Sequence, residues 1–197
     1  MTFIKRGFAL AIPAFFILAW VCVSAAAPDD GFGQAKKIEG KHFTIYYSPP
    51  SALPDLVRQL NITPSDVLLA GASDAPQAGA DVELAQGADA LFSLVCDFLD
   101  MQLYSYKGKI KICLDERQLD TIYKDLFGKD PAAAPMGSFY VSDLNAIYIT
   151  QESFKRLILG HEIAHAVISN YFVVQPPIKV QEILAGYVEY QLRKTTS

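Results

Sequence analysis

The segment His161-Glu162-Ile163-Ala164-His165 contains the residue types that bind a catalytic metal. On an α-helix, residues four apart lie on the same face, so His161 and His165 can direct two imidazole nitrogens at one ion. Glu162 then lies near the open coordination position, where a carboxylate can accept a proton from water. This H-E-x-x-H spacing is typical of zinc hydrolases, and we expect these two histidines to bind Zn²⁺. The alternative is that they only pack or form hydrogen bonds.

A catalytic zinc usually has three protein ligands, so the two histidines require a further donor. The candidate is Glu182, which follows across Pro176-Pro177 and lies near the start of an apolar helical pattern. Because proline interrupts a helix, the chain can reverse there and bring a second helix beside the one that carries His161 and His165. The sequence therefore predicts a helix pair around one metal.

The residues around Glu182 resemble a motif of the gluzincin metallopeptidases, the superfamily of thermolysin, the aminopeptidase N-like enzymes and the peptidase MA-like domains of secreted bacterial proteins. In that superfamily a second helix often reads N-E-G-x-A-x-Y-x-E. The chain matches it at Glu182, Ala185, Tyr187 and Glu189. The resemblance covers residues 137–192 and implies that Glu182 is the third zinc ligand and that Glu189 at most supports a ligand. It also implies an α+β fold, a zincin-like single domain with a small mixed sheet packed on helices and an H-E-x-x-H helix.

The resemblance implies a secreted zinc metallopeptidase. Zinc would lower the pKa of its bound water toward 7, and Glu162 would take that proton and pass it to the leaving amine. Tyr140, Tyr148 and Tyr171 are the candidates for stabilising the oxyanion. The chain lacks the G-x-M-E-N motif that binds a free amino terminus, so we expect endopeptidase activity. Residues 145–149 resemble the edge strand that pairs with extended substrate.

Two alternatives to peptidase activity stay open. The chain ends before the downstream domain that usually supplies a catalytic Tyr or His, so the protein can instead be a catalytically weak zinc-binding or peptide-binding module of the cell envelope. It can also be a structural envelope domain in which Glu162 and the two histidines have no function.

The N-terminal residues 1–25 read as a signal peptide, with Lys5 and Arg6 before the apolar run Phe8–Val23 and small residues after it. We expect cleavage after Ala25 and a secreted or periplasmic protein; the alternative is an uncleaved membrane anchor. Cleavage leaves 15 basic side chains against 21 acidic ones, a net charge of −6. Nucleic acid is therefore excluded as a partner, and a peptide or protein substrate is expected.

The remainder divides into a flexible lead-in at 26–40 and one zincin-like domain at 41–197. Hydrophobic periodicity and turn residues predict the elements of that domain. We expect strands at 41–47, 109–114, 137–141 and 145–149, short helices near Pro54 and Pro64, and longer helices at 81–104, 116–127, 151–171 and 178–193. Cys96 and Cys113 are predicted to form a disulfide, with two buried thiols as the alternative.

Overall fold

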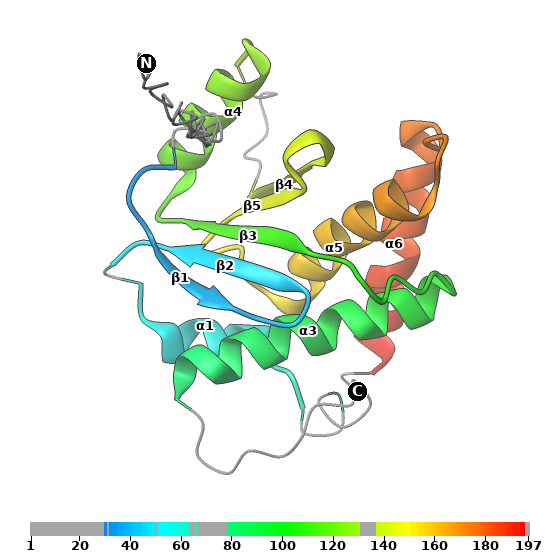
Figure 1. The fold of residues 1–197 in the computed structure, drawn as a ribbon, viewed down its shortest axis with the longest axis horizontal. Coiled ribbons are helices and arrows are strands. Elements are labelled where there is room, and N and C mark those ends of the chain that lie inside the picture. Colours follow the sequence, from blue (N-terminus) through cyan, green and yellow to red (C-terminus); the bar gives the residue numbers. More distant parts are fainter. Residues whose placement is uncertain are drawn as a thin grey trace, which may run out of the picture.

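A computed structural model of the chain describes residues 30, 32–49, 51–63, 66, 79–130 and 137–195. The predicted signal segment lies outside these ranges, as does most of the expected helix near Pro64. Within them the fold is mixed α and β, as expected from the sequence (Figure 1). The elements in chain order are β1 (Lys36–Glu39), β2 (Phe43–Tyr47), α1 (Leu53–Leu60), α3 (Ala80–Leu99), β3 (Gly108–Cys113), α4 (Glu116–Phe127), β4 (Ser138–Val141), the 3-10 turn η1 (Ser142–Leu144), β5 (Ala146–Thr150), α5 (Arg156–Tyr171) and α6 (Ile178–Lys194).

The strands of the described chain form one sheet in the order β1-β2-β3-β5-β4. Strand β3 pairs in parallel with β2 and with β5, whereas β1 and β4 pair antiparallel with their neighbours. The predicted hairpin is confirmed, because β4 and β5 are joined by η1. The order corrects one expectation, since β5 lies between β3 and β4 and cannot be an edge strand. The edge is β4, residues Ser138–Val141.

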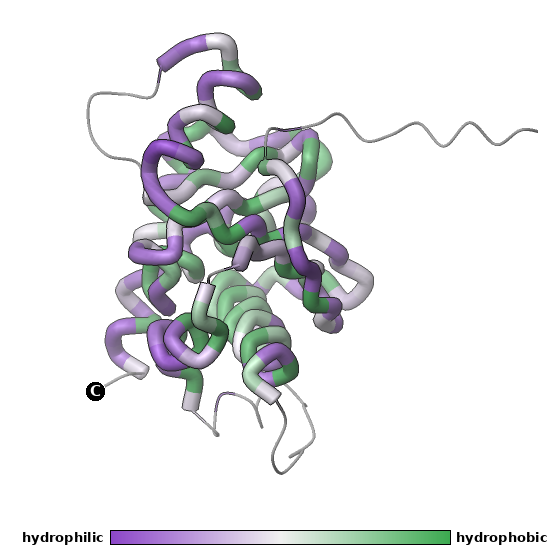
Figure 2. Tube along the Cα trace, turned by 90° about the vertical axis from the view of Figure 1, so that its left-hand side faces the viewer, coloured by the Kyte–Doolittle hydropathy of each residue, from purple (hydrophilic) through white to green (hydrophobic). Residues whose placement is uncertain are grey.

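Helices cover both faces of the sheet. In Figure 1 α1 and α3 lie below the sheet, α5 and α6 lie to its right and α4 lies above it. Residues of α1, α3, α5 and α6 share one core with the sheet, and these four helices form the lower helix layer. In Figure 2 hydrophobic stretches run mainly along the sheet and the helices beneath it, whereas α4 at the top is mostly hydrophilic. The main core therefore lies between the sheet and the lower helix layer, and the predicted packing of the long helix on the sheet is confirmed by the contacts of α3 with β1 and β2.

Strand β3 shows why the predicted disulfide is wrong. Successive side chains of a strand point to opposite faces. Ile112 faces the lower core together with Cys96 of α3, whereas Cys113 belongs to the cluster under α4. Both cysteines are buried free thiols on opposite sides of the sheet. Burial raises the pKa of Cys96 to about 11 and that of Cys113 to about 12.

The lead-in is ordered where the structure describes it, contrary to the expectation of a flexible segment. Lys36–Glu39 forms β1 because its backbone pairs with β2, and the buried Phe32 packs in the cluster under α4. The Asp30 carboxylate pairs with the Lys111 ammonium group and accepts a hydrogen bond from the Tyr148 hydroxyl. Asp30 and Phe32 therefore belong to the upper side of the sheet, and Lys36–Glu39 belongs to the sheet itself.

Helix α4 follows the predicted boundaries. The side chain of Asp115 accepts a hydrogen bond from the backbone N–H of Gln118 at 2.9 Å, which satisfies one of the free donors of the first turn. Gly128 ends the helix in the left-handed region with φ 64°. Local cap residues thus define both ends of this element.

Helix α5 begins at Arg156, five residues later than expected. Thr150 does not cap it, because Thr150 belongs to β5 and its hydroxyl accepts a hydrogen bond from the backbone N–H of Ser153 in a turn. The backbone N–H of Gln151 still donates to the Cys113 carbonyl oxygen at 3.0 Å. Pairing with β3 therefore continues past the predicted helix start.

The first residue of α5 is a buried arginine with three partners. Arg156 Nη1 donates to Asp66 Oδ2 at 2.6 Å and to the Asn61 carbonyl oxygen at 3.2 Å. Its Nη2 donates to Thr195 Oγ1 at 3.0 Å, just after α6. This arginine therefore connects the start of α5 with the end of α6.

Helices α5 and α6 pack closely and antiparallel. A Cβ added at Gly160 would lie 2.3 Å from Leu192 Cδ1, so a larger residue there would displace the end of the Leu192 side chain. No described helix is both long enough and apolar enough to cross a membrane.

Candidate metal centre

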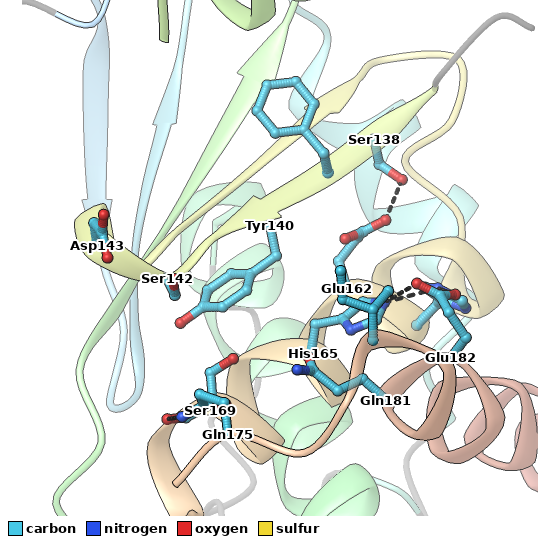
Figure 3. A pocket seen from close by; sticks show the side chains of 13 residues that line it. Ser138, Tyr140, Ser142, Asp143, Glu162, His165, Ser169, Gln175, Gln181 and Glu182 are labelled. Carbon is cyan, nitrogen blue, oxygen red and sulfur yellow. Dashed lines mark hydrogen bonds and ion pairs between the residues drawn. The ribbon is translucent and has the colours of Figure 1, made fainter. Parts of the chain in front are cut away.

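The close helix pair brings the three predicted ligands together. His161 and His165 come from α5, and Glu182 comes from the second turn of α6. Their donor atoms lie close enough together to hold one metal ion, and no other group of His, Cys, Asp or Glu side chains among the described residues does so. The two Nε2 atoms are 3.1 Å apart. Each lies 3.5 Å from one of the two Glu182 carboxylate oxygens (Figure 3).

These separations fit a tetrahedral zinc. Bonds of about 2.0–2.1 Å at tetrahedral angles place neighbouring donor atoms roughly 3.4 Å apart. The separation of the two nitrogens and the distance from each nitrogen to its nearer Glu182 oxygen lie within a few tenths of an ångström of that value. Two imidazoles and one carboxylate are also the donor set of known catalytic zinc sites.

Glu189 determines which nitrogen of His161 can bind a metal. Its Oε1 lies 2.7 Å from His161 Nδ1, so the imidazole donates its N–H there. The lone pair of a neutral ring is then on Nε2, the atom that faces His165 and Glu182. A carboxylate behind a metal-binding histidine fixes the ring in this way. Glu189 thus occupies the supporting position that the resemblance implies.

His165 is held in its neutral form, in which an imidazole nitrogen has a lone pair that could bind a metal. Burial lowers the pKa of His165, and the neighbouring His161 acts in the same direction. Glu182 and a side-chain hydrogen bond with Gln181 oppose the shift without reversing it. Gln181 is itself positioned by its amide, which donates to the Pro176 carbonyl oxygen at 2.9 Å.

Glu162 lies beside the donor cluster and not in it. Its side chain is buried, with 7% of the residue exposed, and its Oε1 accepts a hydrogen bond from Ser138 Oγ at 2.7 Å. Burial raises the pKa of the Glu162 carboxyl, and Glu182 and Glu189 act in the same direction. The Ser138 hydroxyl and His161 act against this rise. The carboxyl is thus prepared to hold a proton near the cluster.

A cleft of about 740 Å³ opens over these residues. The edge strand β4 and η1 form one wall, through Ser138, Tyr140 and Asp143. The other wall comes from α5, from α6 including its first residue Ile178, and from the segment between them, which contributes Gln175. The cleft therefore joins the metal-binding cluster to an unpaired strand edge of the described chain.

The structure separates the three candidate tyrosines for oxyanion stabilisation. Tyr148 is buried on the opposite face of the sheet, and Tyr171 does not line the cleft. Tyr140 does line it, but its hydroxyl donates to Asn145 Oδ1 at 2.9 Å and accepts from Asn170 Nδ2 at 3.2 Å. Burial raises the pKa of Tyr140 to about 12, so this hydroxyl keeps its proton at neutral pH.

Sequence reasoning does not find Ser138, Gln181 or the β4 edge. The sequence indicates Ser138 only as part of a strand, and a serine there carries no distinguishing spacing. It indicates Gln181 only as a neighbour of Glu182. Both contacts join residues from separate elements, so helical or strand periodicity cannot indicate them.

No family model, no curated protein and no solved structure matches this chain significantly. The assignment of a function therefore depends on the geometry and chemistry of the site.

Proposed function

We propose that the protein is a secreted or periplasmic zinc metallopeptidase with a zincin-like fold, related in its site to the gluzincins. The observation that supports this best is the proximity of the three side chains: the Nε2 atoms of His161 and His165 are 3.1 Å apart, and each lies 3.5 Å from a different carboxylate oxygen of Glu182. These residues would hold the zinc, and Glu162 lies beside them without being needed as a ligand.

When bound, zinc supplies an acidified water and polarises the scissile carbonyl. Glu162 accepts a proton at its carboxylate and returns it to the leaving nitrogen, a role that its raised pKa favours. Ser138 holds one carboxylate oxygen and leaves the other for this transfer. Glu189 keeps the His161 ring in the orientation in which Nε2 faces the cluster.

The substrate would lie extended along β4, and not along β5 as expected from the sequence. Strand β4 has an unpaired outer edge among the described residues and lines the cleft beside Glu162. An added peptide strand gains backbone hydrogen bonds at such an edge. This arrangement needs no charged terminus, so we propose endopeptidase activity on peptide or protein substrates.

The test measures zinc content and cleavage together. Purified protein reconstituted with zinc should retain one ion per chain and cut peptides blocked at both ends. Glu162→Gln should retain the zinc but lose about 10²–10⁴-fold in rate, because it removes the proton acceptor while nearly keeping the shape. Failure of the parent protein to bind zinc would refute the proposal. Cutting only of peptides with free amino termini would refute the endopeptidase assignment.

The engaged hydroxyl of Tyr140 supports a second candidate function. Because this hydroxyl donates to Asn145, it is not free to stabilise an oxyanion, and neither Tyr148 nor Tyr171 lines the cleft. The alternative is a zinc-binding, peptide-binding module with little catalysis. Full zinc occupancy without cleavage of a broad peptide library would favour it.

A further inference from the structure

The exposed large hydrophobic side chains are concentrated in one part of the chain. Thirteen such residues are exposed in the described ranges, and nine of them lie between Tyr171 and Tyr190. Single exposed hydrophobics are ordinary, but a concentration of this kind marks an interaction surface. The segment comprises the end of α5, the turn into α6 and most of α6.

The turn between α5 and α6 projects aliphatic side chains into solvent. Val173 is 101% exposed, Val174 is 83% exposed and Ile178 is 77% exposed. From Asn170 to Gln181 the sequence contains one charged residue, Lys179. A turn that exposes this much aliphatic surface with so little charge is unfavourable in water unless something covers it.

Helix α6 is apolar on two sides. Ala185, Val188 and Leu192 recur at helical spacing and pack in the core. Ile183, Tyr187 and Tyr190 recur at the same spacing on the outer side, with 62%, 44% and 54% exposed. A helix that is apolar on both sides is normally covered on both. The outer side therefore continues the apolar surface of the turn along the helix.

The charged side chains near the two ends of the outer side are lysines. The acidic side chains of α6 are Glu182 and Glu189, and both contact His161 next to the cleft. Lys179 is exposed near one end of the helix, and Lys194 near the other places its Nζ 4.2 Å from the Tyr190 ring centroid. The outer side thus combines aliphatic, tyrosine and lysine side chains in a chain whose net charge is −4.

We propose that the α5–α6 turn and the outer side of α6 bind the surface of an anionic lipid bilayer. Apolar side chains bordered by lysines are typical of helices that lie in a membrane interface, and tyrosine is enriched there. A two-fold contact between copies buries the same surface on both subunits, so the projecting Val173 of each copy would need a hollow opposite it. Acyl chains, by contrast, can surround a projecting aliphatic side chain.

Binding through this surface would fix the position of the cleft relative to the bilayer. Gln175 of this turn and Ile178, the first residue of α6, both line the cleft. A bilayer that receives Val173 and Val174 would therefore lie beside the cleft opening, which would present segments of membrane proteins close to the bilayer. Binding to lipid does not depend on hydrolysis, so this proposal stands if the proposed function fails.

Flotation of the exported, zinc-loaded protein with lipid vesicles tests the proposal. The probes are phosphatidylcholine vesicles with and without about one third phosphatidylglycerol. The parent should bind the anionic vesicles more strongly than the neutral ones. The double variant Val173→Asp/Val174→Asp should bind at least about tenfold more weakly, because charge opposes insertion. Val82→Asp, a similar change at a 41% exposed valine of α3, should bind like the parent.

Thermal unfolding and zinc content verify that each variant is folded. Lys179→Glu combined with Lys194→Glu should reduce binding to the anionic vesicles but not to the neutral ones. Absence of vesicle binding by the parent overturns the proposal, and so does undiminished binding by the double valine variant. If the parent does not bind vesicles but forms dimers, and Ile183→Asp abolishes these dimers, a second copy of the chain covers this surface instead.

Discussion

Replacing Glu189 by glutamine should weaken zinc binding without removing a ligand. The Glu189 carboxylate lies 2.7 Å from His161 Nδ1, and its side chain is 30% exposed. Glutamine can still accept the hydrogen bond from the Nδ1–H group but carries no negative charge, so the His161 imidazole becomes a weaker ligand for zinc. Loss of such a supporting contact typically costs about 10–100-fold in metal affinity, or about 1.4–2.7 kcal/mol. Because solvent reaches Glu189, we expect the lower part of this range.

Competition with a chromophoric chelator measures this affinity directly. Thermal unfolding provides a second measurement, because a tenfold weaker ligand stabilises the folded state by about 1.4 kcal/mol less at saturating zinc. Glu116→Gln makes the same charge change on α4, across the sheet, and should leave zinc affinity unchanged. Glu182→Gln should weaken it further than Glu189→Gln does.

Two results would refute this reasoning in different ways. If Glu189→Gln binds zinc like the parent while Glu182→Gln does not, Glu189 does not support His161. If neither substitution changes zinc affinity, the cluster on α5 and α6 is not the metal site.

Ser138→Ala should lower kcat about tenfold or more with little change in KM or zinc content, because the Glu162 carboxylate loses its 2.7 Å hydrogen bond. Ser138→Thr keeps the hydroxyl and should retain most of the rate. An equal loss of rate in both variants would contradict the role of Ser138 in positioning Glu162. Asp66→Asn should cost about 3–5 kcal/mol of stability at neutral pH, because it leaves the Arg156 charge buried without the carboxylate that neutralises it. Burial raises the pKa of Asp66, but the hydrogen bonds from Arg156 and Thr63 together hold this pKa below 3.8 in the folded protein. The ionised Asp66 therefore stabilises the fold above pH 3.8, and this stabilisation is lost as pH falls through the lowered pKa of the folded state. Urea unfolding at several pH values should therefore show parent and variant converging as pH falls below the lowered folded pKa of Asp66, and a difference that persists there would contradict the assignment.

Local signals predict much of the fold. The boundaries of α4 follow from Asp115 and Gly128, and the hairpin of β4 and β5 follows from alternating apolar residues. The spacing of His161 and His165 is sufficient to place two donors on one helix face. Each of these features depends on residues close together in the sequence.

Features that depend on contacts between distant segments are not predicted. The strand nearest the site in the sequence, β5, is interior, because strand order is set by long-range pairing. Thr150 resembles a helix cap, but pairing of β5 with β3 continues through it. Cys96 and Cys113 are close in the sequence, yet the alternation of β3 directs Cys113 to the other face. The Ser138 contact with Glu162 likewise joins a strand to a helix.

The contacts of Arg156 bear on how the proposed metal ligands are held. Helices α5 and α6 are connected at one end by the turn before Ile178 and at the other by the hydrogen bond from Arg156 to Thr195. The donors on the two helices lie between these connections, which oppose a change in their separations. Mg²⁺ and Mn²⁺ favour six oxygen ligands, whereas the proposed donors are two imidazoles and one carboxylate, a set that suits zinc. A hydrogen bond made by a buried arginine behind the cluster would therefore help to keep the helix pair at the spacing that a proposed zinc site needs.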